Sequence, residues 1–177
     1  AAMIQRGEIR GVTSNPSIFH NAISKTRDYD SALVPMAWAG WGAEKIFWQL
    51  AVEDIQRTCD LFRSLYEETD GGDGFVSLEV HPGLAHDATD TLAQAKELWG
   101  KVDRPNLMIK IPATLEGLDA IRAAIAAGLN INVTLIFSIE RYREVMKAYL
   151  DGLETFLHQP SEGENGCPPA SVASFFV

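Results

Sequence analysis

Five short apolar segments, separated by stretches in which apolar residues recur at helical spacing, constrain the fold of this chain most. The segments are residues 11–16, 75–82, 107–114, 131–137 and 171–177. Strands that alternate with helices predict a parallel sheet covered by helices, either doubly wound or closed into a (β/α)8 barrel. Each segment has apolar residues on one face and polar residues near its C-terminal end on the other. This pattern favours the (β/α)8 barrel, whose strands collect functional residues at their C-terminal ends.

The intervening stretches predict helices, turns and one long loop. Helices are predicted over residues 42–68, 87–99, 117–127 and 138–157. Residues 1–10 are predicted as the polar end of a helix, and Ser17 to Asp30 as polar, turn-forming sequence. Residues 158–169, rich in Gly, Pro and Glu, are predicted as a loop.

Length and composition restrict the class of protein. The chain has 177 residues, of which 46% are hydrophobic and 22% are charged, which fits one globular domain. No apolar run is long enough to span a membrane and no secretory leader is visible, so we expect a cytoplasmic protein. A net charge of -9 argues against a nucleic-acid partner. The spacing of Cys59 and Cys167 is typical of neither a disulfide framework nor a metal site, so we predict free thiols.

One strand contains an ionisable side chain among apolar neighbours. In the segment Leu107–Thr114, Lys110 shares a face of the strand with Met108 and Pro112, while the other face is entirely apolar. Burial disfavours an ammonium ion and favours the neutral, nucleophilic amine that a Schiff base requires. The alternative is that Lys110 marks a strand end and extends its ammonium into water.

Polar side chains on the neighbouring strands are candidates to surround this lysine. Parallel strands stacked at one height would bring together Asn15, Glu79, Lys110, Asn132, Thr134 and Ser174. Schiff-base chemistry at a ketone needs an amine, acid–base groups that add and expel water, and polar groups that hold a hydroxylated substrate. Glu79 could instead form an ion pair with Lys110 that only satisfies two buried charges. The amides and hydroxyls could equally make structural hydrogen bonds at strand ends.

Several of these segments resemble those of a known family. Gly11–Phe19, with the sequence GVTSNPSIF, and Leu107–Leu118, with the sequence LMIKIPATLEGL, resemble the two sequence signatures of transaldolase. The resemblance runs nearly end to end and includes Val76–Val80 and Asn132–Ser138. It implies a (β/α)8 barrel and a transferase of the pentose phosphate pathway. Such an enzyme moves a dihydroxyacetone unit from fructose 6-phosphate or sedoheptulose 7-phosphate to an aldose phosphate, without a cofactor or a metal.

The resemblance also implies a role for each candidate residue. Lys110 matches the lysine that forms the Schiff base, and Glu79 and Thr134 match the pair that handles the catalytic water. The positions that match or adjoin substrate-binding groups are Asn15, Asn132, Ser174, Ser77 and Thr13.

The chain supplies only part of the family pattern. Residues 1–177 resemble one partial barrel domain, roughly strands 2 to 6, without the family's first-strand aspartate and phosphate-binding arginines. We therefore expect impaired activity for this chain alone. Besides sugar-phosphate substrates, we expect a second copy or a complementing chain as a partner, because unpaired sheet edges recruit other strands. The alternatives are a related class I aldolase and a non-catalytic fragment or assembly of the same fold.

Overall fold

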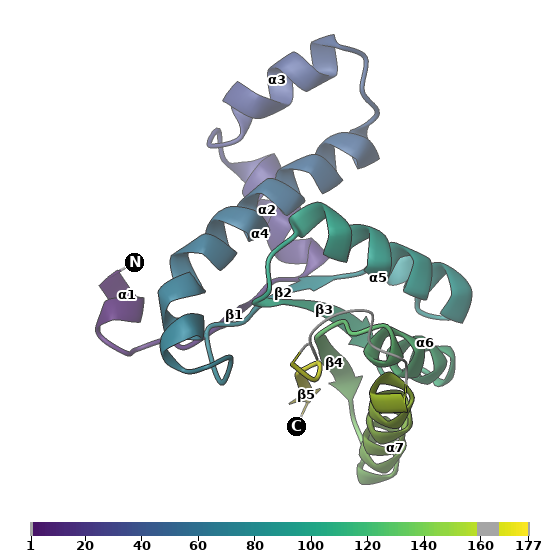
Figure 1. Ribbon diagram of the computed structural model, residues 1–177. Helices are drawn as coiled ribbons and strands as arrows, with labels where there is room; N and C mark the ends of the chain where they lie inside the picture. Colours follow the sequence, from purple (N-terminus) through teal and green to yellow (C-terminus); the bar gives the residue numbers. More distant parts are fainter. Residues whose placement is uncertain (1, 159–166, 177) are drawn as a thin grey trace. The chain divides into compact units, whose positions relative to one another are not determined.

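The computed structural model describes residues 2–158 and 167–176 (Figure 1). Its strands are β1 (Val12–Thr13), β2 (Val76–Glu79), β3 (Leu107–Pro112), β4 (Ile131–Ile136) and β5 (Ser171–Phe175). Its helices are α1 (Ala2–Gln5), α2 (Pro16–Lys25), α3 (Asp30–Trp38), α4 (Ala43–Glu68), α5 (Ala88–Val102), α6 (Leu115–Ala126) and α7 (Ile139–His158), with a short 3-10 helix, η1, at Pro82–Leu84. All five predicted strands are present, and the α/β class is confirmed.

The order of the strands distinguishes the two candidate α/β architectures. The strands follow one another as β1-β2-β3-β4-β5, and the pairs β1–β2, β3–β4 and β4–β5 are parallel. A doubly wound sheet reverses its strand order at a switch point, whereas a (β/α)8 barrel adds each strand beside the previous one. The sequential order therefore supports the barrel.

The chain divides into two compact units. The first unit comprises Ala1–Leu78 and Lys101–Leu107, and the second comprises Glu79–Gly100 and Met108–Val177. None of the helices in the described part of the chain is long and apolar enough to cross a membrane. Most of the loop predicted over residues 158–169, namely 159–166, lies outside the described residues.

The first unit corrects one prediction. Much of the segment from Ser17 to Asp30, predicted as turn-forming, is helix α2. The Asn15 side chain accepts a hydrogen bond from the Ile18 N–H at 2.8 Å, and Pro16 is the first helical residue. An asparagine N-cap followed by proline is a helix-start signal that outweighs the polar composition. Helix α3 was not predicted either, and its internal Pro35 is unfavourable for a helix.

Helix α4 supplies most of the buried apolar surface among the helices of the first unit. Its buried residues are Ile46, Leu50, Ala51, Val52, Ile55, Cys59 and Phe62. Helix α3 lies beside the beginning of α4 (Figure 1), and the Tyr29 hydroxyl before α3 donates a hydrogen bond to Asp54 of α4. Burial, together with this carboxylate, raises the pKa of Tyr29 to about 12. The long helix predicted from Gly42 to Glu68 is confirmed.

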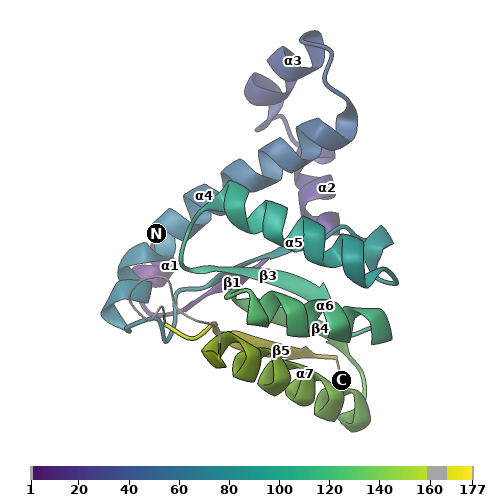
Figure 2. The ribbon, with the colours of Figure 1, turned by 45° about the vertical axis from the view of Figure 1, so that its right-hand side comes forward.

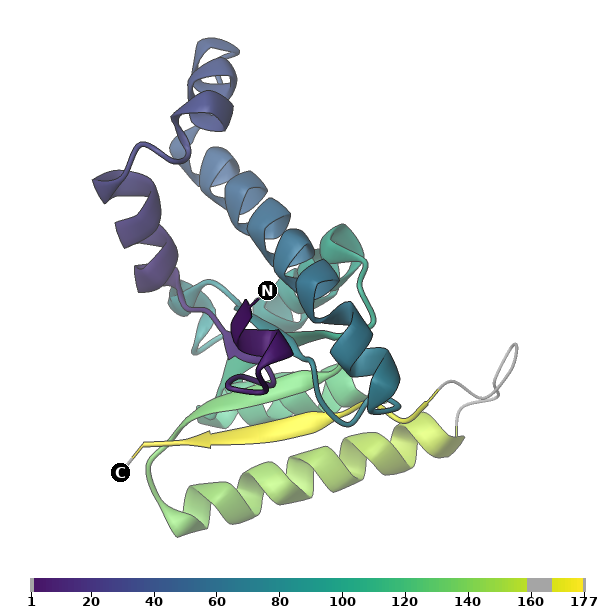
Figure 3. The same ribbon diagram turned by 90° about the vertical axis from the view of Figure 1, so that its left-hand side faces the viewer.

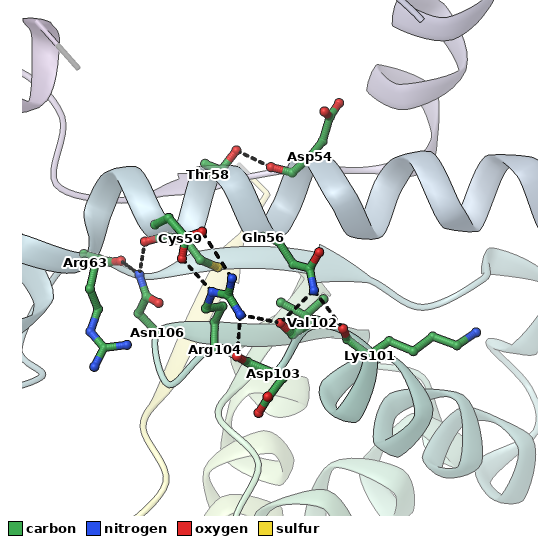
Figure 4. A network of polar contacts seen from close by, with 12 residues as sticks. Asp54, Gln56, Thr58, Cys59, Arg63, Lys101, Val102, Asp103, Arg104 and Asn106 are labelled. Atoms are coloured by element: carbon green, nitrogen blue, oxygen red, sulfur yellow. Dashed lines mark hydrogen bonds and ion pairs between the residues drawn. The ribbon is translucent and has the colours of Figure 1, made fainter. Parts of the chain in front are cut away.

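A network of polar contacts ties α4 to the loop that precedes β3 (Figure 4). The fully buried Asn106 donates from Nδ2 to the carbonyl oxygens of Cys59 and Gly74, both at 2.9 Å. Gln56 of α4 donates to the Lys101 carbonyl oxygen at 3.0 Å. Asn106 satisfies two buried backbone carbonyls, so its hydrogen bonds fix the start of β3 against the helix.

In the second unit, β3, β4 and β5 pair in parallel, and α6 and α7 lie side by side (Figure 2). Helix α7 contacts β4, and Figure 3 shows the helix extended below the strands β4 and β5. Two close approaches require glycine: a Cβ at Gly117 would lie 2.1 Å from the Pro112 carbonyl oxygen, and a Cβ at Gly152 would lie 2.6 Å from the Arg122 carbonyl oxygen. Gly117 therefore lets α6 begin directly against the end of β3, and Gly152 lets α7 pack on α6.

Polar side chains cap three helices. Asp87, Thr114 and Ser138 each accept a hydrogen bond from a backbone N–H in the first turn of the helix that follows. Such caps satisfy donors that the helix itself leaves unpaired. Helix α6 begins at Leu115, two residues before the predicted start at Gly117.

Candidate active site

Strand β3 places Lys110 inside the protein. All six residues of the strand are buried, and Lys110 is 8% exposed. Both faces of a parallel strand between helices are usually covered, which explains the uniform burial. Its lysine therefore does not extend into water, and the snorkelling alternative does not apply to this structure.

Glu79 is the charged partner of this lysine. The Val80 N–H donates to the Lys110 carbonyl oxygen at 3.2 Å, so the end of β2 lies beside the middle of β3 in the second unit. Lys110 Nζ lies 3.1 Å from Glu79 Oε2, and the two side chains are 10% and 15% exposed. At this distance the carboxylate can stabilise an ammonium or accept its proton. The geometry therefore fits both an ion pair and an acid–base pair.

Strand β4 adds two buried polar side chains to the same unit. Asn132 is the register partner of Lys110, and Thr134 is the register partner of Pro112. Asn132 is 4% exposed and Thr134 is 1% exposed. From β5, the Ser174 hydroxyl donates a hydrogen bond to Asn132 Oδ1 at 2.8 Å. The second unit therefore contains Lys110, Glu79, Asn132, Thr134 and Ser174. An ion pair joins Lys110 to Glu79, strand register places Asn132 beside Lys110, and a hydrogen bond joins Ser174 to Asn132.

The three remaining candidates lie in the first unit. Thr13 is exposed and pairs in register with the buried Ser77. Asn15 is half-buried and its side-chain oxygen caps α2. For Asn15, this cap is a structural hydrogen bond, which is the alternative to substrate binding that the sequence allowed. Thr13 and Ser77 are therefore neighbours on paired strands, and their roles stay predictions.

The sequence did not reveal an irregularity in β4. Val133 pairs with Ala173 and Ile136 with Phe175, so β4 contains one residue more than β5 between these pairs. Leu135 has φ 60°, in the left-handed region that leucine rarely adopts, and it is 41% exposed. Such β-bulges redirect side chains and are frequent near active sites. No residue in this segment is typical of a bulge, because glycine and asparagine are absent from residues 133–136.

Other reactive groups are less suited to chemistry. The Cys59 thiol is fully buried, and burial raises its pKa to about 12, which disfavours the thiolate. In the described part of the chain, no three His, Cys, Asp or Glu side chains gather in a way that could hold a metal ion.

Comparison with known proteins assigns the family. The model described as Transaldolase/Fructose-6-phosphate aldolase matches residues 1–177. The chain belongs to this family. It is 51% identical over 177 residues to a transaldolase of Saccharopolyspora erythraea and to one of Thermobifida fusca, covering 100% of this chain and 47% of each relative. A transaldolase of Mycolicibacterium smegmatis is 50% identical over 175 residues, which cover 99% of this chain and 46% of that relative.

These matches define what the five strands represent. The chain spans about half the length of the curated relatives that it matches. Its sequential parallel strands with intervening helices are part of the family's (β/α)8 barrel, so the predicted family and fold are confirmed. The roles of the individual side chains stay predictions, as does a location in the cytoplasm.

Proposed function

We propose that this chain carries the Schiff-base centre of a transaldolase, with Lys110 as the nucleophile. The observation that carries the proposal is the buried lysine of β3 with a carboxylate oxygen 3.1 Å from its amine. A lysine in this environment can pass a proton to Glu79 and then attack a carbonyl carbon as a neutral amine.

The reaction follows from the chemistry of a ketose. Lys110 Nζ attacks the C2 carbonyl to form a carbinolamine, and loss of water gives the protonated imine. A base takes the proton of the C4 hydroxyl, and C4 becomes the aldehyde of a departing aldose phosphate as the C3–C4 bond breaks. The electron pair of that bond stays on the lysine-bound dihydroxyacetone unit as an enamine. The enamine then attacks the aldehyde of an acceptor aldose phosphate, and water releases the new ketose. Fructose 6-phosphate and sedoheptulose 7-phosphate are the proposed donors.

The other candidates receive roles in this sequence. Glu79 and Thr134 are proposed to move the water that leaves and returns at C2, because both lie in the unit that holds Lys110, Thr134 buried and Glu79 half-buried. Asn132 is proposed to hold the dihydroxyacetone unit beside the lysine that is its register partner. Roles in substrate binding remain proposed for Ser174, Asn15, Ser77 and Thr13.

A second candidate function is that of a class I aldolase. The description of the matching family includes fructose-6-phosphate aldolase, and both activities need the same lysine imine. The two activities differ in the fate of the enamine. In the aldolase it is protonated and hydrolysed to free dihydroxyacetone, whereas in the transferase it attacks the aldehyde of an aldose phosphate. Incubating the chain with fructose 6-phosphate, with and without erythrose 4-phosphate, and measuring free dihydroxyacetone separates the two.

Borohydride trapping tests the shared step. Borohydride reduces an imine between Nζ and the ketose to a stable secondary amine, which peptide mass spectrometry can locate. With fructose 6-phosphate we expect one adduct on Lys110 and no adduct in Lys110→Met. Lys147→Ala is the control, because this α7 lysine has a 74% exposed side chain and we expect the adduct to persist. A folded wild-type chain without an adduct, or with adducts distributed over surface lysines, would overturn the proposal.

A further inference from the structure

Helix α3 is apolar on every side and yet contains no buried residue. From Ala32 to Trp38 its sequence is ALVPMAW, without a charged side chain. A helix that is apolar all round is normally buried within a protein. Helix α4 lies beside α3 (Figure 1), but no residue of α3 is buried. The helix therefore has the composition of a covered element and the exposure of a surface element.

The outer side of α3 is a stripe formed by Asp30, Val34 and Trp38, which we call the α3 stripe. These residues follow one another at intervals of four and share one side of the helix. Val34 is 36% exposed and Trp38 is 87% exposed, whereas Leu33 and Met36 are half-buried. Tryptophan is enriched in protein–protein interfaces, where its large ring contributes much of the binding energy. The exposure of Trp38 therefore indicates a surface that another protein covers.

The two ends of the α3 stripe carry opposite charges. Asp30 is the first residue of the helix. At the other end, three residues beyond Trp38, the Lys45 ammonium lies 3.9 Å from the centre of the Trp41 ring. Between Asp30 and Glu44 the sequence contains no charged residue. The surface is therefore a neutral apolar patch with a carboxylate at one end and an ammonium at the other.

This distribution of charge favours a second copy of the chain as the occupant. A two-fold dimer brings one patch against the same patch of the partner, so the patch has to be complementary to itself. If two α3 helices pack antiparallel, they meet at Val34, the middle of the stripe, and each Asp30 lies at the end of the partner's Lys45. Arg27 and Glu44, which adjoin the two ends, meet in the same way. At a net charge of -9, contact through acidic faces would instead set like charges against each other.

We infer that the α3 stripe is a self-association surface, through which two copies of this chain form a two-fold dimer with antiparallel α3 helices. Trp38 of each copy packs against α3 of the other, and Asp30 of each pairs with the partner's Lys45. Helix α3 belongs to the first unit and Lys110 to the second, so the inference is independent of the proposed function.

Sedimentation equilibrium of the whole chain over the micromolar range tests the surface. We expect the mass to rise with concentration from 19.4 kDa toward twice this value. Trp38→Glu should raise the dissociation constant about 30-fold or more, the effect of losing an interface hot spot. Leu61→Glu is the matched control, because it introduces the same charge at a 54% exposed leucine of α4 and should leave the constant unchanged. A chain that stays at the mass of one copy, or a dimer that Trp38→Glu leaves intact, would overturn the inference.

Exchange of charge at the two ends tests the antiparallel arrangement. In Asp30→Lys and in Lys45→Glu, two identical copies place like charges opposite each other, so each variant alone should dimerise about 3- to 10-fold more weakly than the wild type. In an equimolar mixture of the two variants, both contacts of the mixed dimer join opposite charges, and association should return toward the wild-type strength. Mixing does not rescue a variant that fails to fold. A mixture that dimerises as weakly as its components would show that the helices do not pair in this way.

Discussion

The two units each bury a polar cluster, and the partners of the polar side chains differ. In the first unit, the Asn106 cluster consists of Asn106, Gln56 and the backbone carbonyls that they bind. In the second unit, the lysine cluster consists of Lys110, Glu79, Asn132 and Ser174, in which Lys110 bonds to the Glu79 side chain and Ser174 to the Asn132 side chain. Buried polar groups that satisfy the backbone hold secondary structure in place. Buried polar groups that satisfy one another are free to exchange protons and partners, which makes the lysine cluster the better candidate for chemistry.

Charge is the second difference between the clusters. Asn106 is neutral and fully buried, whereas Lys110 and Glu79 bring opposite charges into an environment with little water. A buried ion pair contributes little net stability, because desolvation offsets the attraction, but losing one partner is costly. The two clusters should therefore respond differently when one side chain is removed and when two are removed.

The largest effect is expected from Lys110→Met. The substitution leaves the Glu79 carboxylate without its ammonium, and we expect a loss of about 3 kcal/mol in the free energy of unfolding. The double variant Lys110→Met/Glu79→Leu removes both charges and should recover most of this loss. Urea unfolding followed by circular dichroism measures both. If the double variant is less stable than the single one, the ion pair stabilises the fold, as the hydrogen bonds of Asn106 do.

A somewhat smaller effect is expected from Asn106→Ala. The carbonyl oxygens of Cys59 and Gly74 lose a buried donor, which costs about 2–3 kcal/mol. Local opening of α4 can be measured from thiol labelling, because Cys59 is buried and Cys167 is exposed. We expect Cys59 to react slowly in the wild type and faster in Asn106→Ala, with Cys167 unchanged as the internal reference. Equal labelling of Cys59 in both proteins would show that Asn106 does not hold the helix.

Sequence patterns predicted the lysine cluster better than the Asn106 cluster. The period of two in a strand is enough to place Lys110 and Asn132, and parallel pairing then makes them neighbours. The role of Asn106 depends on two carbonyls that lie far from it in the sequence, and no local pattern encodes that contact. Strict alternation also fails at the bulge: it places Leu135 on the same face as Ile131 and Val133, yet Leu135 is 41% exposed while the other two are fully buried. An inserted residue changes the register without leaving a compositional signal.

The backbone beside each cluster offers a third comparison. Asp103 near Asn106 has φ 49° and Leu135 near the lysine cluster has φ 60°. Aspartate tolerates this region, while leucine does not. Leu135→Gly should therefore change the free energy of unfolding by less than about 0.5 kcal/mol, because relief of strain offsets the lost apolar contacts. The matched strand control Val172→Gly, at a 43% exposed position, should cost about 1 kcal/mol. Equal losses at the two positions in thermal unfolding would argue against strain at Leu135.

The smallest effect is expected from an exposed ion pair near the Asn106 cluster, in which Arg104 Nε lies 2.6 Å from Asp60 Oδ1. The hydrogen bond from Arg104 holds the pKa of the Asp60 carboxyl below its usual value. A carboxyl whose pKa is lowered on folding stabilises the protein fully above its unfolded pKa, and this contribution disappears as the pH falls through the lowered value. Asp60→Asn should therefore be slightly less stable than the wild type near neutral pH and equal to it in acid.

Salt provides the control for this last comparison. The Asp60 side chain is 56% exposed, so dissolved ions screen its attraction to Arg104, whereas Glu79 and Lys110 are largely shielded from them. In about 1 M NaCl the difference between Asp60→Asn and the wild type should vanish, and the loss caused by Lys110→Met should remain. A salt-sensitive loss in Lys110→Met would mean that water reaches the lysine cluster. The case for a water-excluded nucleophile at Lys110 would then fail.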